Sequence, residues 1–366
     1  MRLLGLAAAD FRNYTQLELE PHLGLNLFIG ENAQGKSNLL EAIAVLGIGK
    51  SFRGARDAEM LRTGAELASV RGTVANGVCE TAVACSIARK AAGTRKTFTR
   101  AGKKIPYAQF LGTLRVVTFV PADLQLVTGT PGLRRTFLNM ALSQHDATYY
   151  RELSRYQAAL RQKNALLRET SDADEALLSV YNRVLAESGA RLAVKRRAFV
   201  GRLAEEAARA HARWSAGETL QLRYSPNVAF EGDGEEIARE ALAAKLLAVA
   251  PIERRRKMAL AGPHRDDLLF LLDGGPLSAF GSQGQQRTAV LALKIAEYAV
   301  MRDIGGEAPI LLLDDVLSEL DARRTAAFLA GVGDYEQAYI TATHHPGPSI
   351  RPSALFTVRA ARIFPA

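Results

Sequence analysis

Cysteine is scarce in this sequence, and long apolar runs are absent. The two cysteines, Cys79 and Cys85, stand six positions apart, with no CxxC pair and no histidine pair of zinc-ligand spacing nearby. We therefore expect both to be buried thiols of a reduced, cytoplasmic protein. No apolar run approaches the roughly 20 residues that cross a bilayer, and no charged and apolar leader opens the chain. We expect a protein that is neither secreted nor embedded in a membrane.

Several enzyme signatures are also missing. The sequence has no Gly-x-Ser-x-Gly elbow and no HExxH string, and His264-Arg265-Asp266 is followed by Leu271 where a kinase catalytic loop needs asparagine. Residues 139–215 carry long helical patterns without sustained heptads, which predicts a packed helical arm and not a coiled coil.

Positive charge is in excess and is unevenly distributed. The net charge is +9, and residues 89–104 contain seven basic residues and no acid. Residues 183–213 contain eight basic residues against three glutamates. A solvated hairpin tip and a solvated helix face are the ordinary interpretations, but two such clusters in one basic chain favour a phosphate-backbone partner. The predicted DNA contacts are Lys103, Lys104, Lys195, Arg196 and Arg197.

A glycine loop lies between a predicted strand and a predicted helix near the start of the chain. Residues 24–29 form a short apolar run, residues 30–37 match the P-loop pattern, and apolar residues at helical spacing follow. Backbone N–H groups of such a loop surround phosphates, Lys36 neutralises the β- and γ-phosphates, and the Ser37 hydroxyl binds Mg²⁺. The predicted ligands are ATP and Mg²⁺. The predicted nucleotide-binding residues are Gly30, Glu31, Asn32, Ala33, Gln34, Gly35, Lys36, Ser37 and Asn38.

An unbroken apolar run ends in two carboxylates far downstream. Residues 310–313 read as a central parallel strand covered on both faces, followed by Asp314 and Asp315. Adjacent buried acids repel each other unless a cation lies between them, so Asp314 is the expected Mg²⁺ ligand. Asp315 is expected to orient or deprotonate the attacking water. The alternative is an exposed pair of loop acids.

Two further segments are expected to contact phosphate. Residues 280–287 place a hydroxyl, a glycine and a glutamine at the start of a helix, and we expect Ser282, Gly284 and Gln285 to form an ABC-type signature loop. Residues 318–321 match the D-loop that follows the acidic strand. The next predicted strand, residues 337–342, delivers Thr343, His344 and His345 to the same edge. One of them, with His344 favoured, is expected to sense the γ-phosphate.

Taken in order, these motifs resemble the RecF family. The resemblance includes residues 11–14, 38–43, 51–53, 131–138, 262–267 and 281–287, so it covers nearly the whole chain. The P-loop and signature are shared with SMC and Rad50 proteins, whereas the length, the string at 262–267 and the missing coiled coil are typical of RecF. The resemblance implies an α/β ABC-type, Rad50-like ATPase head with a short helical arm. It also implies ATP-dependent homodimerisation, DNA binding, and help in loading RecA at gaps together with RecR and RecO.

The resemblance also guides the remaining assignments. Arg12, Asn13 and Tyr14 are placed on the adenine side, with a core position as the alternative for Tyr14. The head is expected to comprise residues 1–120 with 260–366, and the inserted helical lobe residues 121–259. Two departures are notable: Asp123 or Gln125 stands in place of the usual glutamine, and the acid pair is Asp-Asp and not Asp-Glu. The shorter Asp315 predicts slow hydrolysis, as in a switch.

Two other classes remain open at this point. One is a transport ATPase subunit, which needs a membrane partner, and the basic clusters argue against it. The other is a nucleotide-dependent scaffold that acts through proteins alone, which a salt titration of DNA binding distinguishes.

Overall fold

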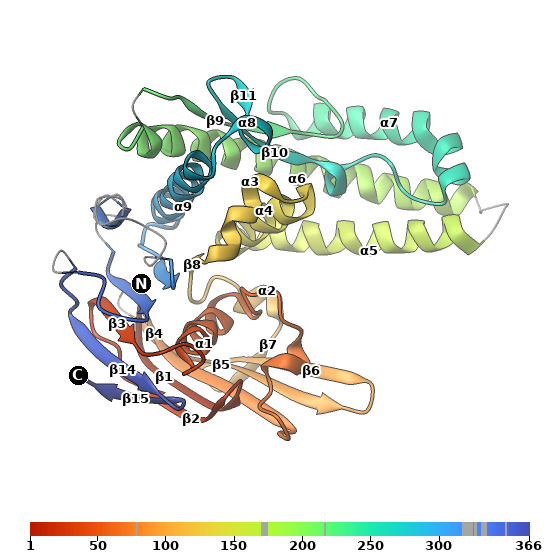
Figure 1. Cartoon of the computed structure of the whole chain (residues 1–366). Helices are drawn as coiled ribbons and strands as arrows, with labels where there is room; N and C mark the ends of the chain where they lie inside the picture. The colour runs from red at the N-terminus through yellow and green to blue at the C-terminus, as the bar shows by residue number, and fades with distance from the viewer. Residues whose placement is uncertain are drawn as a thin grey trace. The chain divides into compact units, whose positions relative to one another are not determined.

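The computed structural model divides the chain into two compact units (Figure 1). It describes residues 1–77, 79–169, 175–215, 217–316, 325, 328–330, 335–347 and 350–366. Residues 1–124 and 290–366 form the first unit, and residues 125–289 form the second. The expected boundary near residue 260 is therefore wrong by about thirty residues, because residues 260–289 pack with the helical unit.

A six-stranded sheet forms the centre of the first unit. Its order is β15 (Arg362–Pro365), β14 (Ala354–Arg359), β3 (Gly24–Ile29), β13 (Gln337–Ala342), β12 (Ile310–Asp314) and β8 (Val116–Phe119). Neighbouring strands are parallel except for the β14–β15 hairpin. Every residue of β12 and β13 is buried, as their continuous apolar runs predict for central parallel strands.

A second, antiparallel sheet completes this unit. Its order is β2 (Tyr14–Leu19), β1 (Arg2–Phe11), β4 (Leu67–Asn76), β5 (Cys79–Lys90), β6 (Gly93–Arg100) and β7 (Lys103–Ile105). Helix α1 (Lys36–Ile48) is almost entirely buried and contacts strands of both sheets. The short segments η1 (Asp57–Met60), α2 (Tyr107–Phe110) and η2 (Pro121–Leu124) connect the strands. Cys85 is buried as expected, but Cys79 at the start of β5 is exposed.

Helices dominate the second unit. They are α3 (Gln125–Thr128), α4 (Pro131–His145), α5 (Ala147–Glu169), α6 (Glu175–Ala212), α7 (Glu235–Arg256), η3 (Pro263–Arg265) and α8 (Leu277–Phe280). A small sheet joins β9 (Leu220–Ser225), β10 (Asp267–Leu272) and β11 (Gly275–Pro276). Because β10 pairs with β9 along its whole length, residues 267–272 belong to this unit. Helix α9 (Gln283–Gly305) begins in it and continues into the first.

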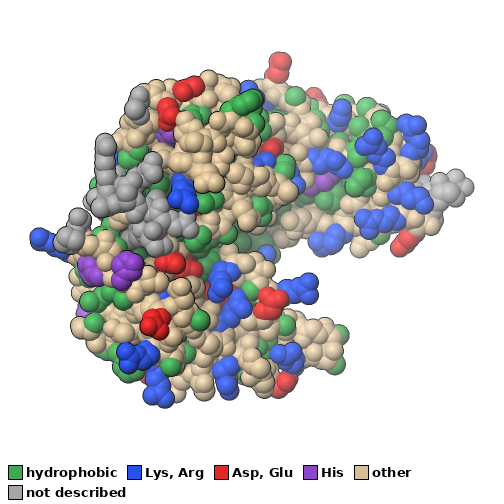
Figure 2. Space-filling model, viewed as in Figure 1, with side chains coloured by type: hydrophobic (Ala, Val, Ile, Leu, Met, Phe, Trp, Pro, Cys, Tyr) green, Lys and Arg blue, Asp and Glu red, His purple; other side chains and the backbone are tan. Residues whose placement is uncertain are grey.

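Basic side chains gather on the surface of the helical unit, over α5, α6 and α7 (Figure 2). No helix in the described part of the chain is long and apolar enough to cross a membrane.

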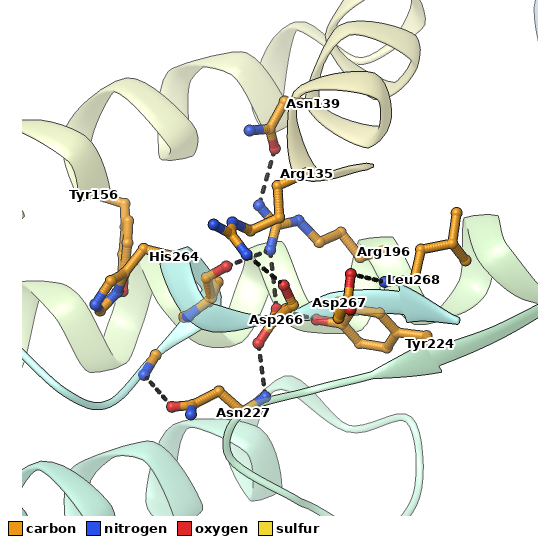
Figure 3. Close-up of polar contacts among 12 residues, drawn as sticks. Arg135, Asn139, Tyr156, Arg196, Tyr224, Asn227, His264, Asp266, Asp267 and Leu268 are labelled. Carbon is orange, nitrogen blue, oxygen red and sulfur yellow. Dashed lines mark hydrogen bonds and ion pairs between the residues drawn. The ribbon is translucent and has the colours of Figure 1, made fainter. Parts of the chain in front are cut away.

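A buried arginine ties the helices of this unit to the segment before β10 (Figure 3). Arg196 of α6 is only 2% exposed. Its guanidinium donates to Asp266 Oδ2 at 2.9 Å and to the Pro263 carbonyl at 2.7 Å. It also donates to the Tyr149 hydroxyl at 3.0 Å and to Asn139 Oδ1 at 2.9 Å. Each of the three guanidinium nitrogens of this buried cation thus donates at least one hydrogen bond, as a buried charge requires.

The carboxylate and the backbone carbonyl of Asp266 accept further hydrogen bonds. Its carboxylate accepts hydrogen bonds from the Tyr224 hydroxyl and, at 2.8 Å, from the Asn227 amide. Its carbonyl accepts from Arg135 Nη1 at 2.8 Å. The neighbouring Asp267 forms a two-contact ion pair with Arg134 of α4, at 2.6 and 2.9 Å. The acids of the 262–267 string therefore join α4, α6 and β9, and are not catalytic-loop acids.

The prediction that Arg196 contacts DNA is therefore wrong. Its charge is neutralised inside the unit by an acid 70 positions away in sequence. The flanking Lys195 and Arg197 are partly exposed, but each is engaged within the unit. Lys195 pairs with Asp146, and the Arg197 guanidinium lies 3.6 Å from the centre of the Phe230 ring.

Replacing Arg196 with methionine should strongly destabilise the protein. The change leaves the Asp266 carboxylate buried without its cation, and breaking a buried pair costs about 3–5 kcal/mol. Urea unfolding followed by circular dichroism measures the loss. The matched control is Arg239→Met, because Arg239 forms an exposed pair with Glu236 on the surface of α7. Equal unfolding midpoints for the two variants would contradict the structural role of Arg196.

Candidate nucleotide-binding site

The loop between β3 and α1 needs glycine at both of its ends. A Cβ atom at Gly30 would lie 2.3 Å from the Val358 carbonyl oxygen of β14. Gly35 has φ 114°, and a Cβ there would lie 3.0 Å from Asn13 Nδ2 and 3.1 Å from the Tyr14 hydroxyl. Gly35 caps α1 without any side-chain hydrogen bond, so the first-turn N–H groups of the helix face the loop. This arrangement is typical of an anion site at a helix start.

Lys36 turns back over this loop. Its Nζ donates to the Gly30 carbonyl at 2.5 Å and to the Glu31 carbonyl at 2.8 Å. Burial lowers the pKa of this buried amine, and the charges of Asp315 and Asp314 oppose that shift. A phosphate in the loop would offer Lys36 a full negative charge in place of two neutral carbonyls, which is a stronger partner for a buried cation.

The first acid of the downstream pair reaches the same site. Asp314 lies at the buried end of β12, and burial raises the pKa of its carboxyl. Hydrogen bonds from the Ser37 and Thr341 hydroxyls act in the opposite direction, the latter at 2.8 Å. The Asp315 amide donates to the Thr341 hydroxyl at 2.9 Å, and Asp315 takes φ 53°. The structure thus brings Lys36, Ser37, Asp314 and Asp315 together.

Ser37 and Asp314 fit a hard cation. One hydroxyl and one carboxylate oxygen face each other, both are ligands that Mg²⁺ accepts, and Mg²⁺ takes its remaining ligands from water and phosphate. No cluster of three or more metal-binding side chains occurs among the described residues.

The next strand delivers the expected sensor residues to this edge. Strand β13 lies between β3 and β12, and Thr343, His344 and His345 follow its end. The Thr343 hydroxyl lies 2.9 Å from His344 Nδ1, and the histidine is exposed. Their position agrees with the prediction, and the choice among them stays open.

Of the three residues predicted to contact adenine, Tyr14 and Arg12 make hydrogen bonds within the first unit. Tyr14 is fully buried, and its hydroxyl donates to the Gly35 carbonyl at 3.2 Å, so the core alternative is correct. Arg12 forms a two-contact pair with the buried Glu41, both distances being 2.6 Å. Asn13 is exposed and accepts a hydrogen bond from Asn38 at 2.8 Å, so its adenine contact remains a prediction.

One residue near the site had no role assigned from sequence. Arg53 is exposed and donates to Asn38 Oδ1 at 3.1 Å, and its charge lowers the pKa of Asp314. The only sequence signal for Arg53 is its place in the 51–53 string. Gln34, a predicted loop residue, contacts the chain near its end: its Oε1 accepts from the Ala360 amide at 2.6 Å, and its carbonyl accepts from Ala361 at 3.0 Å.

The predicted signature loop begins α9 with a capping box. The Ser282 amide donates to Gln285 Oε1 at 2.7 Å, and the Gln285 amide donates to the Ser282 hydroxyl at 3.2 Å. Ser282 is exposed and Gly284 is partly exposed, while the adjacent Phe280 is 82% exposed. The loop is thus an accessible helix start. The predicted D-loop at residues 318–321 lies outside the described residues.

The two candidates for the missing glutamine differ in surroundings. Asp123 Oδ2 accepts from the Val120 amide at 2.8 Å, and burial raises the pKa of its carboxyl against the opposing charge of Lys294. Gln125 is exposed at the start of α3. Asp123 and Gln125 both stay predictions for the position of the usual glutamine.

A parallel sheet with a P-loop, a buried strand-end acid and a separate helical unit defines a P-loop ATPase head of the SMC type. Residues 2–358 match the family described as RecF/RecN/SMC N terminal domain. The chain is 41% identical to the DNA replication and repair protein RecF of Symbiobacterium thermophilum, covering 99% of this chain and 98% of that one. It is 38% identical to the RecF of Listeria monocytogenes, covering 95% and 94%.

A solved structure agrees. The structure described as the recombination mediator protein RecF-ATP in the RecFOR pathway superposes with a TM-score of 0.92 at 32% identity, covering 100% of this chain and 97% of that one. The chain belongs to the RecF family of DNA replication and repair proteins.

Replacing Asp314 with asparagine should stabilise the ligand-free protein at neutral and higher pH. Folding raises the pKa of this carboxyl, so its contribution to stability is present at low pH and is lost as pH rises through the folded value. Removing the charge should therefore raise the melting temperature more at pH 8 than at pH 5. Calorimetry at both pH values checks this, with the exposed Asp303→Asn as control. A gain that is larger at pH 5 would contradict the assignment.

Proposed function

We propose that this protein is an ATP-dependent DNA-binding protein of recombinational repair and replication restart, in which bound ATP controls the hold on DNA. The observation that carries the proposal is the meeting of Lys36, Ser37 and Asp314 at one sheet edge behind a glycine loop. The first-turn N–H groups of α1 and the Lys36 ammonium bind the phosphates, and Ser37 and Asp314 hold Mg²⁺. When bound, Mg²⁺ neutralises charge on the β- and γ-phosphate oxygens.

Hydrolysis is proposed to be slow. Asp315 follows the metal-binding acid and is held in a left-handed backbone conformation by the Thr341 hydroxyl. An aspartate is one methylene shorter than the glutamate usual at this position, so it orients water less closely. His344, or its neighbour Thr343, contacts the γ-phosphate from the end of β13. The cycle then works as a switch between two states of DNA affinity.

DNA binding is proposed to include the β6–β7 hairpin. Lys103 and Lys104 lie on β7, both are exposed, and Arg95 and Arg100 are exposed on the adjacent β6. Phosphate contacts of this kind carry no base information and make binding salt-dependent. The solved relative is described as a recombination mediator protein of the RecFOR pathway, and by that likeness we propose RecR, RecO and RecA as partners.

Two copies of the chain are proposed to share two nucleotides. The P-loop lies in the first unit, where its residues 31–33 are exposed, and the signature loop at residues 281–287 lies in the second, where Ser282 is exposed. A two-fold dimer allows each signature loop to close over the partner copy's γ-phosphate, so two composite sites form. Loss of the γ-phosphate removes the group that joins the copies, which opens the dimer.

The Lys36→Met variant tests nucleotide binding. Methionine keeps much of the stem volume but removes the only basic side chain of residues 30–37, so ATP affinity or turnover should collapse while the fold persists. Isothermal calorimetry with ATP and Mg²⁺, beside circular dichroism of the free protein, measures both. Near-normal ATP binding and turnover in a folded variant would refute the P-loop assignment.

The Ser282→Arg variant tests the composite site. Arginine fills the space for the γ-phosphate at the start of α9 but leaves the P-loop of the same chain intact. The variant should bind ATP as a monomer and lose hydrolysis, whereas the parent should dimerise with ATP and not with ADP. Sedimentation with each nucleotide decides between these outcomes. A parent that stays monomeric with ATP, or a variant that dimerises normally, would overturn the mechanism.

A further inference from the structure

The exposed basic side chains of the helical unit are not confined to the basic cluster at residues 183–213. Most cations of α6 are engaged by acids from other elements. Arg191 pairs with Glu152 and Glu235, whereas Arg209 pairs with Glu205 and Glu206 of its own helix. Together with the pairs of Lys195 and Arg196 described above, these contacts neutralise the centre of the 183–213 cluster. Its remaining exposed cations without an ion pair to a described carboxylate are Arg183, Arg202 and Arg213.

On helix α5, most exposed arginines form no ion pair with a described carboxylate. One face of this helix is buried, through Leu153, Tyr156, Ala159, Lys163 and Leu167. Arg151, Arg155, Arg161 and Arg168 are all exposed and lie on the other face. Of these four arginines, only Arg155 forms an ion pair with a described carboxylate, Glu187 at 2.9 Å. The acid Glu152 of the same helix is buried, and Glu169 is the one acid exposed on it.

The residues between these arginines are small or neutral. Ser154, Gln157, Ala158, Gln162, Asn164 and Ala165 are exposed or partly exposed between them, and Leu160 and Leu166 are only partly exposed. Small side chains permit close approach of a partner backbone, and the two glutamines supply neutral hydrogen-bond donors. Figure 2 shows Lys and Arg side chains gathered on this part of the molecule. The face is therefore a stripe of guanidinium groups without exposed large apolar side chains, which does not fit an apolar protein partner.

The dimensions of the stripe suit a nucleic-acid backbone. Arg151 and Arg168 are 17 positions apart, which corresponds to about 25 Å along a helix. One strand of duplex DNA advances about 3.4 Å per phosphate along its axis, so this length faces roughly seven phosphates. All four cations are arginines, whose planar donor groups bind phosphate with two hydrogen bonds.

We propose that the solvent-facing side of α5, through Arg151, Arg161 and Arg168, binds the sugar–phosphate backbone of duplex DNA. This inference rests on the proposed function and assigns its DNA contact to a helix outside the two basic clusters of the sequence. The proposed contact is with phosphates, which carry no base information, so binding through this face should not depend on base sequence.

The test compares salt titrations of duplex binding for two double variants of equal charge change. Arg161→Gln with Arg168→Gln should lower the slope of log K against log salt by up to about two units, one for each lost phosphate contact. The control is Arg239→Gln with Arg254→Gln on α7, which removes two exposed arginines that are already paired with Glu236 and Glu175. The control should keep the parental slope. Fluorescence anisotropy with two duplexes of unrelated sequence measures both, and the α5 effect should be the same for each duplex.

Three outcomes distinguish failure of the α5 contact from failure of the proposed DNA-binding function. An α5 variant that matches the α7 control, in a parent whose binding is salt-dependent, overturns the α5 contact and leaves the proposed DNA function intact; an acidic protein partner would then be the occupant of this face. A parent with no salt-dependent DNA binding overturns the proposed function itself. Arg161→Lys with Arg168→Lys should restore most of the slope because it keeps both charges, and a slope as low as that of the glutamine variant would also overturn the contact.

Discussion

The register of three parallel strands is the constraint on which the candidate site depends. Thr341 of β13 is paired with Asp314 of β12 on one side and with Phe28 of β3 on the other. This pairing brings the end of β3, and with it the glycine loop, to the same sheet edge as the acid pair. A slip by one residue would turn Thr341 away from Asp314 and reverse the faces of every following side chain. The continuous burial of β12 and β13 allows no such slip without exposing their apolar residues.

Two charged side chains of the site lie in buried positions, where loss of contact with water disfavours their charged forms. Lys36 and Asp314 are both buried, and for both the first cause of the pKa shift is loss of contact with water. Each pKa is shifted toward the neutral form of its group, because burial disfavours the charged form. A phosphate and a cation relieve both shifts at once, because they supply the opposite charge at each position. Ligand affinity and the instability of the free site thus have the same physical origin.

The parts of the structure that sequence predicted are those encoded by local pattern. The loop at residues 30–37, the buried strand before Asp314 and the helix start at Ser282 depend on neighbours within a few positions. The parts that it missed depend on residues far away. Arg196 looked like a surface cation because its partner Asp266 is 70 positions distant, and the boundary near residue 260 was misplaced because β10 pairs with a strand about 50 positions earlier. Arg53 was missed for the same reason, since only the folded chain shows its contact with Asn38. Gln34 was predicted as a loop residue, but its contact with the β14–β15 turn is likewise visible only in the folded chain.

The contact of Gln34 with Ala360 and Ala361 has a consequence for biosynthesis. The glycine loop is translated early, whereas the strands on both sides of β3 and the turn that holds Gln34 come more than 300 positions later. At about 5–20 residues per second, that interval lasts roughly 15 to 60 s. During this time β3 lacks both neighbouring strands, while the helical unit between them can already fold around Arg196. The sequence of the helical unit is therefore synthesised in full before the strands that complete the sheet edge of the candidate site.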